Sequence, residues 1–140
     1  MKNRILLIIF PLVLSISAPL FSQTAARLEA LLETPALTWE QAAAFIRDAA
    51  NSESPDSEQK WLPKNASMGD IARLKGVALL LMRSFEIKGG IFYRIAKSPH
   101  HAYRELVYRS VIRGDTDPDM PVSGRNLLLM INRILAMREE

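Results

Sequence analysis

Residues 102–135, "AYRELVYRSVIRGDTDPDMPVSGRNLLLMINRIL", contain two helical patterns joined by an acidic turn. Apolar residues recur at helical spacing up to Gly114, and a glycine can end a helix because it takes the left-handed conformation without steric cost. After the turn, Ser123 is a candidate N-cap, since a serine hydroxyl can accept a hydrogen bond from a free backbone N–H. The stretch therefore predicts a helix, a short turn and a second helix that reaches residue 137.

Similar patterns lie nearer the N-terminus. In "LTWEQAAAFIRDAA", Thr38 and Gln41 match the capping box, in which a hydroxyl and an amide satisfy free N–H groups at a helix start. A helix is therefore predicted over residues 38–50. Residues 24–33 carry leucines at the spacing of one helix face, which predicts a shorter helix before it.

The most apolar pattern lies in the middle of the chain. Ser67 and Asp70 resemble an acidic capping pair, and the predicted helix runs over residues 67–87 until glycines 89–90 end it. Its apolar residues cover more than one face, which predicts the central and most buried helix. Residues 91–97, "IFYRIAK", predict either a helical turn or an extended connector.

The helix starts suggest a repeat. A further helix is predicted from Ser98-Pro99 to Arg113, because proline fits the first turn of a helix. The predicted caps Ser67 and Ser123 are then 56 residues apart, which divides the chain into two helix pairs at about 36–88 and 98–137. No segment reads as a strand ladder. The expected fold class is all-α: one small helical domain, residues 23–140, built from two helix-turn-helix repeats.

The first residues have the layout of a secretory signal peptide. Lys2 and Arg4 precede an apolar stretch over residues 5–20, and small residues follow. We expect a leader over residues 1–22, cleaved near Ser22, with no retained membrane span and export to the periplasm or cell surface. Without the two leader cations the formal charge falls from +3 to +1. Such a nearly neutral domain is a poor nucleic-acid binder.

The two predicted repeats resemble the S-layer-homology domain, in which a helix with an aromatic residue, a Gly-Asp turn and a second helix follow one another. Tyr103 takes the aromatic position, Gly114-Asp115 opens the turn, and Pro121-Val122-Ser123 precedes the second helix. Trp39 is the aromatic residue of the first unit. The resemblance implies a non-catalytic module of the cell envelope that binds an anionic cell-wall polymer.

The family motif Thr-Arg-Ala-Glu is altered in both units. The second unit has Ser123-Gly124-Arg125-Asn126 and the first has residues 67–70, so neither places arginine directly after the hydroxyl residue. Because the family uses that arginine for polymer binding, another cation would have to replace it. Arg125, Arg73 and Lys64 are the candidates by their position in the sequence.

The binding surface is expected on the basic helix, the acidic turn and the start of the last helix. Arginine side chains can grip an anionic polymer or a carboxylate on a partner. The candidate ligand- or partner-binding residues are Tyr103, Arg104, Arg109, Arg113, Asp115 and Arg125. The alternative to cell-wall polymer is an envelope protein, which would make the chain a periplasmic protein–protein adaptor.

A calcium-dependent structural module is a second alternative. Asp115, Asp117 and Asp119 have the spacing of the first calcium ligands in an EF-hand loop. Met120 and Asn126 occupy the positions where that loop needs glycine and glutamate, so a structural turn without a metal is the favoured interpretation. No nucleophile and base are paired in the sequence. We therefore expect neither enzymatic activity nor a cofactor.

Overall fold

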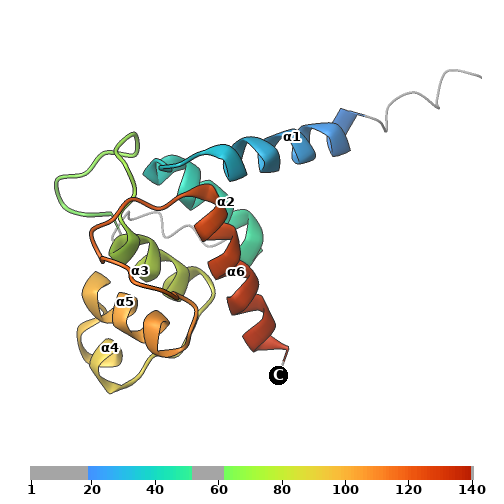
Figure 1. Cartoon of the computed structure of the whole chain (residues 1–140). Helices are drawn as coiled ribbons and strands as arrows, with labels where there is room; N and C mark the ends of the chain where they lie inside the picture. The colour runs from blue at the N-terminus through green and yellow to red at the C-terminus, as the bar shows by residue number, and fades with distance from the viewer. Residues whose placement is uncertain (1–18, 52–61, 140) are drawn as a thin grey trace, which may run out of the picture.

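The computed structural model describes residues 19–51 and 62–139 (Figure 1). These residues form six helices and no β-strand, which confirms the all-α class for the described part of the chain. The helices are α1 (Pro19–Glu33), α2 (Trp39–Ala50), α3 (Leu74–Ser84), α4 (Ile91–Ala96), α5 (Pro99–Tyr108) and α6 (Gly124–Arg138). Most of the predicted leader, residues 1–18, lies outside the described residues.

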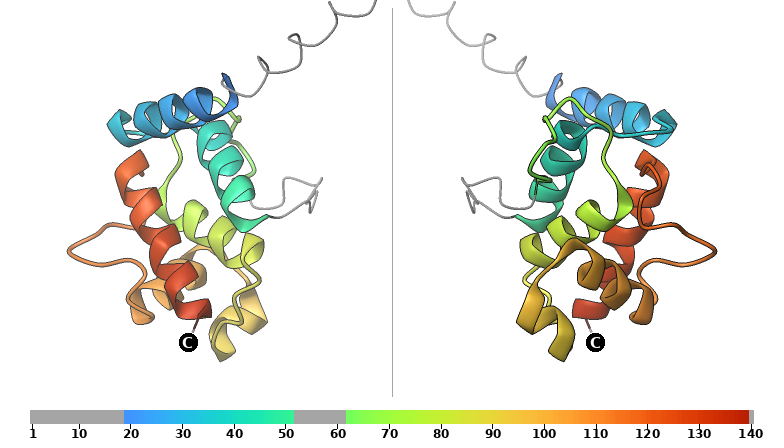
Figure 2. Two further views of the ribbon diagram at one scale, coloured as in Figure 1. Left: turned by 90° about the vertical axis from the view of Figure 1, so that its right-hand side faces the viewer. Right: turned by 90° about the vertical axis from the view of Figure 1, so that its left-hand side faces the viewer.

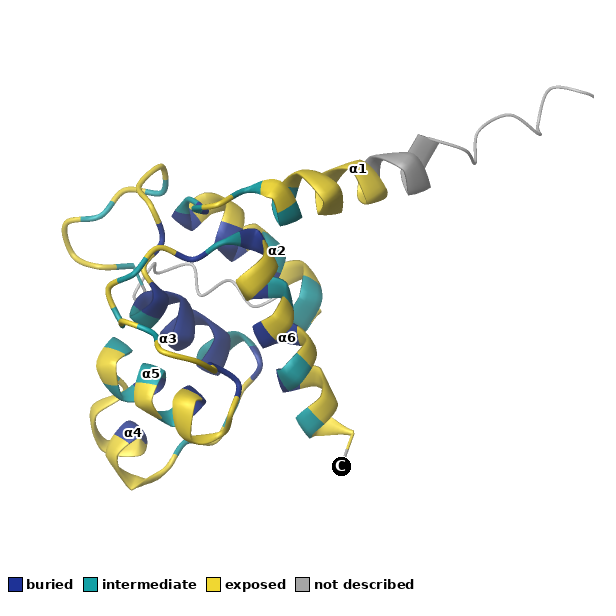
Figure 3. Ribbon diagram, viewed as in Figure 1, coloured by how far each residue is buried: buried dark blue, intermediate teal, exposed yellow. Residues whose placement is uncertain are grey.

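Helix α3 is the centre of the core. Its apolar side chains are buried on nearly every side, as the sequence predicted for the central helix (Figure 3). Trp39, at the start of α2, packs directly over Gly76: a Cβ added to that glycine would lie 2.3 Å from Cη2 of the indole. A small residue in α3 therefore makes room for the largest side chain of the core.

Several helix ends differ from the predicted ones. Helix α3 begins at Leu74 and not at Ser67, because Ser67 and Asp70 close a turn of their own, in which the Asp70 carboxylate accepts the N–H of Ser67 at 2.8 Å. It ends at Ser84, before the glycine pair 89–90, and the backbone turns at Glu86, whose φ is +51°. Residues 91–96 are helical.

Helix α5 is also shorter than predicted, since it ends at Tyr108 and not at Arg113. Ser110 follows with a φ of +59°, and the N–H groups of Val111 and Ile112 both donate to the carbonyl of Leu106. The chain therefore leaves the helix one turn early, and both apolar residues turn inward to become buried.

Three segments far apart in the sequence meet in a closed ring of backbone hydrogen bonds. Leu37 donates its N–H to the carbonyl of Val122 at 2.8 Å, Val122 donates to Ala72 at 3.2 Å, and Ala72 donates back to Leu37 at 2.8 Å. All three side chains are fully or almost fully buried. We call this ring the junction. It binds together the residues that precede α2, α3 and α6.

The segments that meet at the junction also provide a hydrogen-bond acceptor for the first N–H group of each of these three helices. Trp39 donates to the carbonyl of Asp70, Leu74 to Met120 and Gly124 to Thr34, each at 3.0 Å. The free N–H groups at a helix start usually need a side-chain cap or water, but here a neighbouring segment supplies the acceptor. The N-caps are residues 38, 73 and 123, so they lie 35 and 50 residues apart, and the predicted spacing of 56 was measured from the wrong residue.

The remaining helices are arranged around this junction. Helix α5 packs on α3, and α6 packs on both α1 and α2. Helix α4 contacts α5 and lies at the opposite end of the molecule from α1 (Figures 1 and 2). The loop over residues 109–123 returns from α5 to the junction, and it carries half of the predicted binding residues.

Candidate functional site

Tyr103 anchors this loop to α5. Its hydroxyl donates to the carbonyl of Thr116 at 2.8 Å and lies 2.9 Å from the Thr116 hydroxyl. The ring is half-buried and packs against the core. Tyr103 therefore has a structural role in positioning the loop, whereas the sequence predicted that it contacts a ligand.

The aspartates form a turn and do not converge on a common centre. The Asp117 carboxylate accepts the N–H of Asp119 at 2.6 Å, and the Asp119 carboxylate forms an ion pair with Lys75 at 2.5 Å. Asp115 is exposed. Among residues 19–51 and 62–139, no three His, Cys, Asp or Glu side chains are grouped closely enough to hold a metal ion. The arrangement of these carboxylates therefore gives no support to the calcium interpretation.

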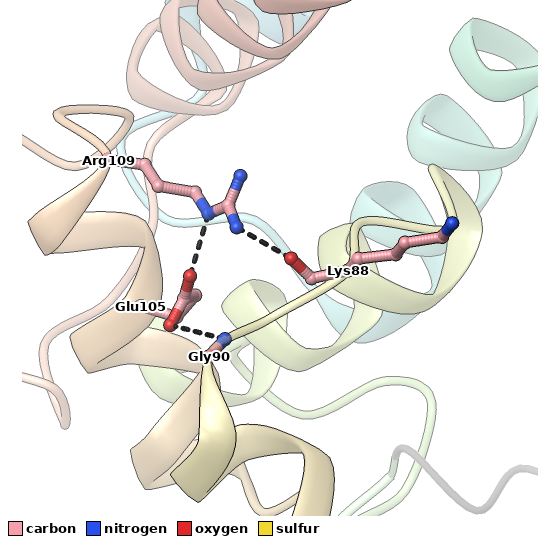
Figure 4. A network of polar contacts seen from close by, with 4 residues as sticks. All are labelled: Lys88, Gly90, Glu105 and Arg109. Carbon is pink, nitrogen blue, oxygen red and sulfur yellow. Dashed lines mark hydrogen bonds and ion pairs between the residues drawn. The ribbon is translucent and has the colours of Figure 1, made fainter.

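Arg109 belongs to a polar network that ties α5 to the segment before α4 (Figure 4). Its Nε donates to Oε1 of Glu105 at 2.7 Å, and its Nη2 donates to the carbonyl of Lys88 at 2.6 Å. The other carboxylate oxygen of Glu105 accepts the N–H of Gly90 at 3.0 Å. Two of the nitrogen atoms of Arg109 are thus engaged within the protein, which gives this residue a structural role in addition to the binding role that was predicted.

The same network sets the ionisation of Glu105. Partial burial disfavours the charged carboxylate, but the hydrogen bonds from Arg109 and Gly90 and the positive charge of Arg109 outweigh that effect. The pKa of Glu105 therefore lies below its ordinary value. The ionised carboxylate is the form that holds the network together.

A pocket of about 210 Å³ lies between the loop 109–123 and α6. Two arginines line it, and each is anchored to the loop backbone: Nε of Arg113 donates to the carbonyl of Ser110 at 2.8 Å, and Nη1 of Arg133 donates to the carbonyl of Val111 at 2.7 Å. None of the remaining lining residues is charged: they are Leu74, Ile112, Thr116, Met120, Pro121, Val122, Asn126, Leu129 and Met130. We call this site the arginine pocket.

The arginine pocket contains only one of the predicted cations. Arg113 lines it, but Arg104 lies on the other side of α5, beside α4, and Arg125 is exposed in the first turn of α6 without lining the pocket. Of the possible replacement cations, Arg73 donates to the carbonyl of Asp119 at 3.1 Å, and Lys64 is exposed. The predicted surface therefore divides into separate regions.

Sequence reasoning missed Asn126 and Arg133 as site residues. Residues 126, 129, 130 and 133 follow the spacing of one helix face and all line the pocket. The polar residues at the two ends of this row were a signal that the face meets solvent.

No protein-family model matches the chain, and no curated protein or solved structure shows significant similarity to it. Within the described ranges, no helix combines the length and the apolar character needed to cross a membrane.

Proposed function

We propose that this protein is a non-catalytic module of the cell envelope that binds an anionic cell-wall polymer through the arginine pocket. The observation that carries the proposal is the presence of two guanidinium groups, Arg113 and Arg133, in the lining of one small pocket that contains no carboxylate. Two positive charges that line the same pocket favour the binding of an anion in it.

The chemistry of the lining suits a carboxylate or phosphate group. Each arginine uses one N–H for a loop carbonyl, and a guanidinium has five N–H donors in a fork that matches such anions. Leu129 and Met130 supply an apolar wall, and Asn126 supplies an amide. A ligand with both charged and apolar atoms, such as a substituted sugar, fits this combination.

The size of the pocket favours a polymer over a free metabolite. A volume of about 210 Å³ is below the range of roughly 300–1,000 Å³ that is typical of small-molecule sites. It accommodates one charged substituent, while the rest of a chain would lie outside on the surface. The leader pattern and the resemblance to S-layer-homology repeats support a location outside the cytoplasm, where such polymers occur.

Sedimentation with isolated peptidoglycan sacculi, before and after removal of the attached anionic polymers, tests the proposal. We expect the protein to pellet with intact sacculi and to stay in solution with stripped ones. Arg113→Gln should weaken binding about tenfold, because a hydrogen bond to a charged group is lost. Arg125→Gln removes a nearby exposed cation outside the pocket and should bind like the unmodified protein.

Three outcomes would contradict this function. Equal binding to intact and stripped sacculi would show that the anionic polymer is not the ligand. An equal loss in Arg113→Gln and Arg125→Gln would show that general surface charge, and not the pocket, is responsible. A single protein captured by crosslinking in intact cells, with no binding to sacculi, would favour an adaptor.

A further inference from the structure

Helix α4 exposes its apolar side chains to solvent to an unusual degree. Ile91, Phe92 and Ile95 are 71%, 76% and 80% exposed, and Tyr108 at the end of the neighbouring α5 is 86% exposed. Isolated exposed apolar residues are common, but several large ones on adjacent elements indicate an interaction surface. Together they form what we call the α4 tip, at the end of the molecule opposite α1 (Figures 1 and 3).

The orientation of α4 is fixed by its other face. Successive residues of a helix lie about 100° apart, so residues 91, 92 and 95 share one side and Tyr93 points to the other. Tyr93 is buried, and its ring lies so close to Gly89 that a Cβ there would meet Cδ1 at 2.3 Å. The hydrogen bond from Gly90 to Glu105 holds the start of the helix. The helix therefore cannot roll to hide its apolar side.

Cationic side chains line two hollows beside the α4 tip. A surface hollow behind Tyr93 is lined by four of them, and Arg104 lines the aromatic groove on the α5 side. The four are Arg83, Lys88, Arg94 and Lys97. Two carboxylates line these hollows: Glu86, and Glu105, which is already paired with Arg109. The α4 tip thus combines an apolar apex with a clear excess of positive charge.

We propose that the α4 tip docks on an anionic lipid bilayer. Isoleucine, phenylalanine and tyrosine side chains partition into the boundary between headgroups and acyl chains, and surrounding lysine and arginine side chains bind anionic headgroups. Long cationic side chains can reach the headgroups while their stems lie along the apolar atoms. A bilayer needs no matching surface shape, which suits side chains that point outward from the end of the molecule. This role is separate from polymer binding and uses residues outside the arginine pocket.

Co-sedimentation with vesicles tests the proposal. The mature protein, without the predicted leader, should bind vesicles of equimolar phosphatidylcholine and phosphatidylglycerol and should not bind vesicles of phosphatidylcholine alone. The double variant Arg94→Gln/Lys97→Gln should bind about 25-fold less, because each cation near an anionic surface contributes about a fivefold factor. Phe92→Ala should weaken binding at least about tenfold through lost apolar burial.

Matched controls distinguish binding through the α4 tip from binding through surface charge or exposed apolar residues elsewhere. Arg27→Gln/Arg47→Gln removes two exposed cations on α1 and α2, and Leu135→Ala shortens an exposed apolar side chain on α6. Both controls should bind the anionic vesicles like the unmodified protein. Because every residue changed is exposed, all these variants should unfold at similar temperatures, which a thermal melt checks.

Insertion of the α4 tip into the bilayer can be measured separately from binding. In Phe92→Trp, the new tryptophan fluorescence, taken as the difference from the unmodified protein, should shift to shorter wavelength when anionic vesicles are added. Binding without this shift would overturn insertion of the apex. No binding to either vesicle, or an equal loss in the controls, would overturn the lipid proposal. If Phe92→Ala abolished a crosslink to an acidic protein instead, the α4 tip would be a protein interface.

Discussion

Gly124 lies where the start of α6 meets the end of α1. A Cβ at this position would lie 1.6 Å from the carbonyl oxygen of Leu31, and the Gly124 N–H donates to Thr34. Gly124→Ala should therefore lower the free energy of unfolding by about 3 kcal/mol, because backbone and not a movable side chain must shift. Chemical denaturation measures this effect.

Gly69 provides the matched control for Gly124. No atom lies within 4 Å of the place where its Cβ would be, so Gly69→Ala should change the free energy of unfolding by less than about 0.5 kcal/mol. Equal effects of the two substitutions would mean that α1 does not approach α6 as described.

Glu105 makes the stability of the α4–α5 region depend on pH. Its pKa is lowered in the folded protein, so its contribution is complete above the pKa of the unfolded state and disappears as the pH falls through the folded-state pKa. Glu105→Gln should lower the free energy of unfolding by about 1 kcal/mol at neutral pH. The difference from the unmodified protein should vanish in acid.

Urea denaturation at a series of pH values checks this dependence. Glu29→Gln, at an exposed position on α1, serves as the control and should follow the unmodified protein throughout. A constant difference between Glu105→Gln and the unmodified protein at every pH would show that the carboxylate charge does not stabilise the network.

Side-chain caps could be predicted from the sequence, but hydrogen bonds to distant carbonyls could not. The hydroxyl groups of Thr38 and Ser123 each accept the backbone N–H of the third residue after them, as expected of an N-cap. Ser98 caps α5 in the same way. In contrast, Arg109 and Tyr103 donate to the carbonyls of Lys88 and Thr116. Every residue has such a carbonyl, so nothing in the residue types identifies these partners.

The start of α3 shows why one helix boundary was predicted incorrectly. Its N-cap, Arg73, makes no side-chain capping bond, and the N–H groups of Leu74 and Lys75 donate to the carbonyls of Met120 and Pro118. Because the acceptors come from a loop far along the chain, the helix needs no local capping residue. The apparent cap at Ser67 belongs to a turn instead.

Two alanine substitutions compare Ser123, which caps α6, with Ser67, which was predicted to cap a helix but lies in a turn. Ser123→Ala removes a hydroxyl that accepts the N–H of Asn126 at 3.2 Å, and it should lower the free energy of unfolding by about 1 kcal/mol. Ser67→Ala leaves the backbone turn with Asp70 intact and should cost less than about 0.5 kcal/mol. Thermal or urea unfolding of both variants tests whether Ser67 caps a helix, with Ser123 as the reference for a true cap. A cost for Ser67→Ala as large as that for Ser123→Ala would restore the start of α3 at Ser67.

The junction should be the last part of the molecule to open. Its three amides, on Leu37, Ala72 and Val122, are buried and bonded in a ring, so no single segment can leave without breaking two of the bonds. We expect all three to exchange with deuterium only through global unfolding, at one common rate. Amides of the short helix α4 should exchange faster.

Hydrogen exchange measured residue by residue by NMR tests this cooperativity. Exchange rates under native conditions should agree for the three junction amides and should respond equally to small additions of denaturant. If Leu37 exchanged much faster than Ala72 and Val122, the segment before α2 would open independently, and the ring would not be a cooperative unit.

The class of the fold could be predicted from periodicity, but the way its parts meet could not. The all-α class and the central position of α3 follow from apolar spacing within single segments. The junction depends on backbone contacts between residues 35, 50 and 85 positions apart, and no pattern within one segment encodes them. The arginine pocket was missed for the same reason, since Arg113 and Arg133 come from different elements.

The ring of Leu37, Ala72 and Val122 also determines when the chain can fold. Its members are 35, 50 and 85 residues apart, so the ring cannot close until residue 122 has been synthesised. Contacts of such long sequence separation form slowly. A newly made chain would therefore lack this ring until the segment before α6 is available. For the export that we propose, this delay would leave the parts of the fold unjoined while a secretion channel threads the chain.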